Sequence, residues 1–175
     1  MHFWLAQLAG LIACGLSCVS YFKGERILYL YLQIAVNLCY VGQYLLLGSY
    51  AGIVNCCIWI SKLAVFLLLA YRKKDTPLWV TVLFCVAGVA LGALVVKTPF
   101  DAIPLLIAVA MTIGVAINRP VALRVIVVAC SVGWVAFNFY AAAYVASAYS
   151  FIEGIATAVS LALFLKRDKT AQNRE

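Results

Sequence analysis

The chain has 175 residues and a net charge of +7, with 67% hydrophobic and only 11% charged residues. Soluble domains carry about 25% charged residues, so this composition excludes an ordinary soluble protein and indicates an integral membrane protein. A helix needs about 20 apolar residues to cross a bilayer. Seven such helices would use nearly the whole chain.

Apolar runs follow one another along the chain, separated by short breaks. The runs lie at residues 3–22, 27–47, 49–71, 77–96, 101–117, 121–142 and 146–165. The breaks carry turn formers and charges, such as Lys23-Gly24-Glu25-Arg26 and Asn118-Arg119-Pro120. The pattern predicts an all-α integral membrane protein with seven transmembrane helices and a polar cytoplasmic tail at 168–175. Pro104 fits either a hinge within the fifth helix or the first turn of that helix.

Basic residues fall mostly on one side of this topology. With seven spans, eleven Lys and Arg residues lie on one side of the membrane and only Lys97 lies on the other. Basic loops remain in the cytoplasm. We therefore expect a multi-pass protein of the bacterial inner (plasma) membrane, with its N-terminus outside and its C-terminus in the cytoplasm. This bias explains the positive charge without a nucleic-acid-binding surface.

The sequence offers no constellation for catalysis or metal binding. Its seven cysteines all fall within apolar runs, and we interpret them as small, buried, reduced hydrophobes. The single histidine, His2, is at the terminus. Nucleotide-binding and hydrolase motifs are absent from the sequence. We expect neither an enzyme nor a cofactor nor a metal site.

The chain repeats itself at a shift of 94 positions. The shift places Tyr50 on Tyr144, Tyr40 on Trp134, and the pair 72–73 on the pair 166–167, with no gap. The sequence therefore predicts a first three-helix repeat at 1–74, a linker helix at 77–96 and a second three-helix repeat at 101–167. An odd number of spans gives both copies the same orientation, as in the parallel repeats of some transporters.

Lys62 and Glu153 are lone charges of opposite sign within apolar runs of the two halves. A charge at membrane depth costs at least a few kcal/mol and faces a protein interior or a watery cavity. We expect a polar site between the halves, with these two residues close enough to pair directly or through water.

Polar and aromatic residues share helix faces with these two charges, because residues three or four positions apart lie on one face. The predicted pocket residues are Asn55, Trp59, Lys62, Trp134, Asn138, Tyr149 and Glu153. In the alternative interpretation, these side chains only hold helices together through hydrogen bonds, as is common in membrane bundles.

Two segments carry a resemblance to a known family. They are Tyr44-Leu-Leu-Leu-Gly48-Ser-Tyr-Ala-Gly52 and Trp134-Val-Ala-Phe-Asn138-Phe-Tyr140. With the three-one-three pattern, they resemble the SWEET/PQ-loop/PnuC superfamily and, within it, the bacterial inner-membrane family typified by YgjV. The Pro-Gln dipeptide of PQ-loop proteins is absent, and the first run has Ala6-Gln7 instead. The resemblance implies transport of small solutes such as sugars, vitamins or nucleosides.

We therefore expect a small-solute transporter or facilitator for an uncharged or zwitterionic polar metabolite, vitamin- or sugar-like, with a pocket between the repeats. The expected partners are the bilayer and this solute, and homo-oligomers are left open. The alternative is a membrane receptor, or an assembly or structural protein with buried polar stripes and no transport.

Overall fold

The computed structural model describes residues 2–22, 26–73, 77–117 and 120–172. Within these residues the chain forms seven α-helices and a short 3-10 helix, so the all-α fold class is confirmed. The helices are α1 (His2–Phe22), α2 (Arg26–Leu47), α3 (Tyr50–Tyr71), α4 (Leu78–Ala93), η1 (Pro99–Ala102), α5 (Ile103–Ile117), α6 (Pro120–Tyr140) and α7 (Tyr144–Gln172). α7 continues helically into the predicted polar tail.

Four of the described helices are long and apolar enough to cross a membrane. These spans are His2–Ser20, Ile27–Leu47, Tyr50–Tyr71 and Tyr144–Lys166. The described apolar parts of α4, α5 and α6 are shorter, at Leu78–Ala93, Pro99–Met111 and Arg124–Tyr140. An integral membrane protein follows from these helices.

The turns after α2 and α6 have the same backbone conformation, 94 positions apart. Gly48 has φ of +72° and Ala142 has φ of +57°. The amide of Ser49 donates to the carbonyl of Tyr44, and the amide of Ala143 donates to the carbonyl of Asn138. These bonds satisfy carbonyls that a helix end leaves unpaired. Both helices therefore end in the same way.

The start of α5 explains Pro104. The amide and hydroxyl of Thr98 both donate to the Asp101 carboxylate at 2.9 Å, which caps the short helix η1. α5 begins at Ile103, so Pro104 lies in its first turn. The missing proline N–H has no intrahelical partner to lose there. Of the two alternatives for Pro104, the helix start is correct.

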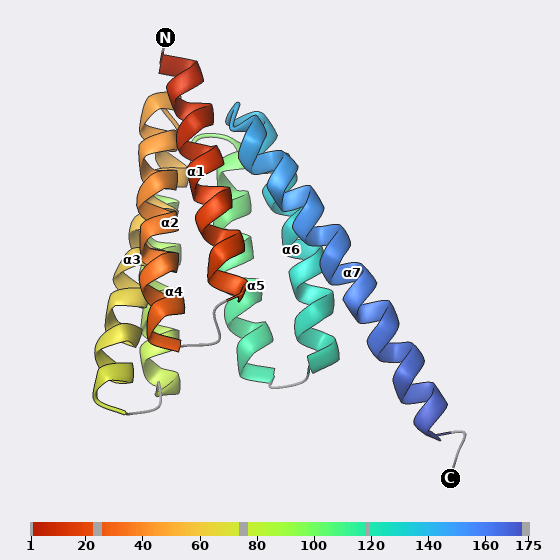
Figure 1. Ribbon diagram of the computed structural model, residues 1–175. Coiled ribbons are helices and arrows are strands. Elements are labelled where there is room, and N and C mark those ends of the chain that lie inside the picture. The colour runs from red at the N-terminus through yellow and green to blue at the C-terminus, as the bar shows by residue number, and fades with distance from the viewer. Residues whose placement is uncertain (1, 23–25, 74–76, 118–119, 173–175) are drawn as a thin grey trace.

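Neighbours in sequence pack side by side around the bundle, and α7 returns to contact α1, while α3 also contacts α5. Figure 1 shows α7 leaning away from the other helices toward its C-terminal end. Only 6% of the apolar span of α7 is buried, against 39% of that of α1. The bundle is therefore closed near the α2–α3 and α6–α7 turns and spread apart at the opposite end.

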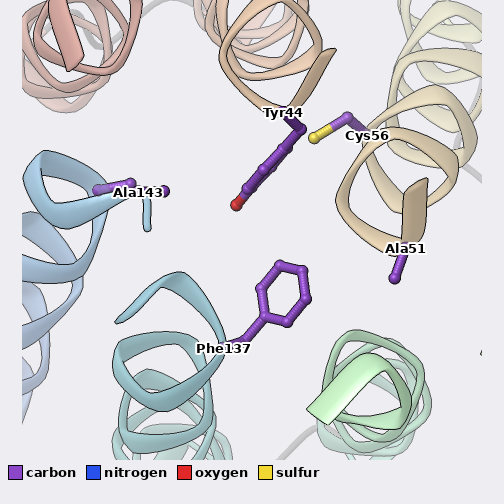
Figure 2. Packing of buried hydrophobic residues seen from close by; sticks show 6 residues of the cluster. Tyr44, Ala51, Cys56, Phe137 and Ala143 are labelled. Carbon is purple, nitrogen blue, oxygen red and sulfur yellow. The ribbon is translucent and has the colours of Figure 1, made fainter. Parts of the chain in front are cut away.

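The core lies at the closed end. The buried cluster consists of Tyr44, Ala51, Cys56, Phe137, Ala143 and Ala146. Figure 2 shows the rings of Tyr44 and Phe137 reaching toward each other from α2 and α6, with centroids 5.8 Å apart. Gly52 permits this packing, because a Cβ there would lie 2.6 Å from the Tyr44 ring.

All seven cysteines are free thiols. Three of them are buried, at positions 14, 56 and 130, and two are partly buried, at 39 and 85. Cys18 and Cys57 are exposed, so the predicted burial is wrong for these two. A thiol is apolar enough to be exposed to lipid without a partner.

Candidate functional site

A central cavity of about 280 Å³ runs along the inside of the bundle. Side chains of α1, α2, α3, α5, α6 and α7 line it. On α2 the lining extends from Tyr44 back to Tyr29, which is about 22 Å of helix at 1.5 Å per residue. Tyr29 lies within one turn of the start of α2. The cavity therefore begins at the closed end and reaches almost to the spread end.

The structure brings most of the predicted pocket residues together around this cavity. The lining includes Asn55, Trp59, Trp134, Asn138, Tyr149 and Glu153. Both three-helix halves contribute, and neither Trp134 nor Asn138 points away from the interior. Their role in binding stays a prediction, but the shared inward-facing volume on which that prediction depends is present.

Lys62 lies elsewhere. It lines a second cavity of about 20 Å³ between α3, α4 and α5, which shares Asn55 and Trp59 with the central cavity. Its ammonium lies 4.7 Å from the centroid of the Trp59 ring and 5.5 Å from that of Phe66. Aromatic faces stabilise a cation in this geometry. Trp59 thus contacts Lys62 and lines both cavities, and the pairing of Lys62 with Glu153 stays a prediction.

Two tyrosines of the central cavity interact with Glu153. The Glu153 carboxylate interacts electrostatically with the side chains of Tyr29 and Tyr149. Tyr149 also shares a hydrogen bond with the Ser17 side chain. Within the described lining, Glu153 is the single carboxylate and no basic side chain is present. The cavity therefore combines one negative charge with ring faces and neutral polar groups.

The closed end of the cavity is held by a bond between the two halves. The Tyr44 hydroxyl donates to Oδ1 of Asn138 at 2.6 Å. The two residues are 94 positions apart, so they occupy equivalent places in the predicted repeat. Asn138 Nδ2 also donates to the Ser150 hydroxyl at 3.4 Å. Each of these three side chains is buried and lines the cavity.

Gln7 ties α1 to the turn between α6 and α7. Its Nε2 donates to the carbonyl of Ala142 at 2.7 Å, and its Oε1 accepts from the amide of Val145 at 3.1 Å. Both backbone groups lie at a helix terminus, where they have no partner within the helix. Gln7 therefore acts as a two-point clamp across the closed end.

Sequence reasoning did not single out Gln7, Tyr29 or Gln33. Gln33 lines the cavity and donates from Nε2 to the Ser20 hydroxyl at 2.8 Å. A lone amide within an apolar run signals a buried polar contact, and both glutamines fit that description. The sequence could have indicated them as contacts, but not their partners, which lie across the bundle.

A comparison with known protein families matches residues 4–170 to Imp-YgjV, described as a bacterial inner membrane protein. The chain belongs to this family. The match covers nearly the whole sequence and agrees with the apolar helices. A bacterial inner membrane location is thereby confirmed. Searches of the curated proteins and of the solved structures found no match.

Proposed function

We propose that this protein is a small-solute transporter of the inner membrane whose substrate site is the central cavity. The observation that carries the proposal is a cavity of about 280 Å³, lined by both halves of the bundle and closed at one end. Ionisable side chains are costly inside a bilayer and mark solute or ion pathways. Here amides, hydroxyls and a carboxylate surround one continuous volume.

The architecture that supports transport is a pair of parallel three-helix repeats joined by α4. Three observations favour it. The α2–α3 and α6–α7 turns match at a shift of 94 positions. Tyr44 and Asn138, equivalent at that shift, meet between the halves. In the repeat α1 corresponds to α5 and α7 corresponds to α3, and both the α1–α7 contact and the matching α5–α3 contact are present. Repeats of this kind rock against each other around a central site.

The arrangement fits one state of an alternating-access cycle. The Tyr44–Asn138 bond and the Gln7 clamp close one end, while α7 leans away at the other. If the basic loops are cytoplasmic, the cavity is accessible from the cytoplasm and closed to the outside. A reporter enzyme fused after Glu175 should then be active only as a cytoplasmic fusion. Activity of a periplasmic reporter at that position would reject this orientation.

The lining chemistry narrows the solute class. Ring faces of Trp59, Trp134 and Tyr149 can stack on a flat or cationic group, and Asn55 can fix its orientation. Asn55 is 5% exposed and lines both this cavity and the smaller one beside it. Glu153 adds a negative charge, whereas Lys62 borders the other cavity. The cavity therefore favours a small neutral or cationic solute, whereas the sequence alone suggests an uncharged or zwitterionic one.

Equilibrium binding to purified protein tests this proposal. Phenyltrimethylammonium, acetanilide and benzenesulfonate are ring probes of similar size with positive, zero and negative charge. We expect the cation to quench tryptophan fluorescence at the lowest concentration and the anion at the highest. The Glu153→Gln variant should bind the cation roughly tenfold more weakly, because one charge contact is lost, and should no longer prefer it to the neutral probe. Equal binding of all three probes would reject the proposed solute class.

Uptake into vesicles then separates transport from binding. The cation that binds best is offered to vesicles that contain wild-type protein or Asn55→Leu. Saturable uptake by wild type and little uptake by the variant support a transporter. Binding without any uptake would instead favour the receptor among the alternatives, and absence of both would favour a structural protein with buried polar stripes.

A further inference from the structure

A surface hollow lies between the beginning of α6 and the second half of α7, apart from the central cavity. Its volume is about 380 Å³, and it is lined by Arg124, Ala156, Val159, Ser160, Leu163 and Phe164. Arg124 is the one charged side chain in this lining. The hollow thus consists of an apolar wall along α7 with a single cation at one end.

The guanidinium of Arg124 is held in place but incompletely bonded. Its central carbon lies 4.5 Å from the centroid of the Phe164 ring. Within the described residues its Nη1 is buried and has no hydrogen-bond partner. A buried donor on a charged group without an acceptor is strongly unfavourable. An anion that reaches Nη1 would relieve this cost.

The surroundings of Arg124 match a molecule that is both anionic and apolar. Val159 is 54% exposed and Leu163 is 55% exposed, so this wall faces the surroundings of the protein, which in a membrane are lipid chains. Arg124 is in the second turn of α6, near the helix end where headgroups lie. The planar guanidinium fits two phosphate oxygens at once. Basic pockets between membrane helices bind anionic headgroups in this manner.

We propose that the groove between α6 and α7 is a binding site for one anionic phospholipid. The phosphate accepts hydrogen bonds from Arg124, and an acyl chain lies along Val159 and Leu163. The lipid fills the space between two helices that diverge toward this end, so it also supports the position of α7. The site is separate from the central cavity, and the inference does not depend on transport.

Native mass spectrometry of the full chain in neutral detergent tests the site. The protein is titrated with dioleoyl phosphatidylglycerol or with dioleoyl phosphatidylcholine. We expect the first phosphatidylglycerol to bind at least tenfold more tightly than phosphatidylcholine. Arg124→Met should weaken that first binding step roughly tenfold, as expected for loss of one charge-assisted contact, whereas Arg124→Lys should weaken it less. Equal affinity for the two lipids would overturn the proposal.

Two controls distinguish lipid binding at Arg124 from general charge attraction and from binding of free phosphate. Arg72→Met removes an exposed arginine that follows α3, and it should leave the first phosphatidylglycerol affinity unchanged. An equal loss in Arg72→Met would show general charge attraction and overturn the site. Glycerol 3-phosphate should not displace the lipid, because it lacks the chain; displacement would identify a free phosphate site instead. Gel filtration of each variant confirms that it is folded before titration.

Discussion

The two ends of the bundle are built from the same kind of apolar helix but are packed differently. At the closed end Phe137 is 0% exposed and Tyr44 is 3% exposed. At the spread end Ile155, Val159 and Leu163 of α7 are each at least 50% exposed. Lipid chains are as apolar as these side chains, so burial alone does not pull membrane helices together. Close packing and interhelical hydrogen bonds must therefore decide which end is closed.

Among the described residues, three hydrogen bonds between the halves close that end. Gln7 contributes two and the Tyr44–Asn138 contact contributes one. In membrane proteins such bonds average about 0.6 kcal/mol each. Together they amount to about 2 kcal/mol, which is within the range that separates two conformations of one protein. The closed end is thus held weakly enough to open in the proposed transport cycle.

The largest expected effect comes from removing the central ring of the closed end. Phe137→Ala should lower the free energy of unfolding by about 3–4 kcal/mol, because it leaves a cavity in a packed region. Unfolding in an SDS titration of mixed micelles measures this change. Phe139→Ala is the matched control, since Phe139 is 66% exposed on the same helix and should cost less than about 1 kcal/mol. Equal costs would remove the distinction between packed and exposed faces.

Two glycine-to-alanine substitutions should differ next most in their effect on the free energy of unfolding. Gly52→Ala would place a Cβ 2.6 Å from the buried Tyr44 ring, and overpacking of this kind costs about 1–3 kcal/mol. Gly15→Ala is the same change on α1, where nothing lies within 4 Å of the added Cβ. It should be neutral or slightly stabilising, because Ala favours the helix. The same SDS titration should separate the two, and a tolerated Gly52→Ala would contradict tight packing at the closed end.

Substitution of Gln7 tests how much its hydrogen bonds stabilise the closed end. Gln7→Met removes both bonds to the α6–α7 turn and leaves a buried carbonyl and amide unpaired, so we expect a loss of about 1–2 kcal/mol. Gln33→Met removes the single bond to Ser20 nearer the spread end and should cost about half as much. If Gln33→Met costs more, the spread end contributes more to stability than its exposure indicates.

The apolar pattern was sufficient to predict seven helices, because long apolar runs favour helices in a membrane, but only four of the described helices are long and apolar enough to cross a bilayer. The shift of 94 positions, together with helix periodicity, predicted which faces turn inward, and residues such as Trp134 and Asn138 do line the cavity. It was harder to predict which neighbouring helices a given face of a helix contacts. Lys62 lies three residues beyond Trp59 on α3, and that rotation directs it toward α4 and α5 instead of the central cavity. One helix face, taken alone, does not show which neighbour it meets.

The smallest effect, and the sharpest test of closure between the halves, concerns single hydroxyl groups. Tyr44→Phe removes the bond to Asn138 while keeping the ring, so it should cost about 1 kcal/mol, with a coupling of about 0.6 kcal/mol to Asn138→Leu in a double-mutant cycle. Tyr31→Phe is the control: its hydroxyl meets that of Tyr71 at 2.9 Å, but both are exposed, and this loss should be below about 0.5 kcal/mol.

If transport is measurable, Tyr44→Phe should also shift the protein toward opening at this end, because one of three closing bonds is gone. Labelling of the buried Cys56 thiol, which belongs to the same cluster as Tyr44, by a membrane-impermeant maleimide added from outside would report that opening as faster labelling than in the Tyr31→Phe control. Strictly additive stability changes with unchanged labelling would mean that the Tyr44–Asn138 bond does not close the bundle.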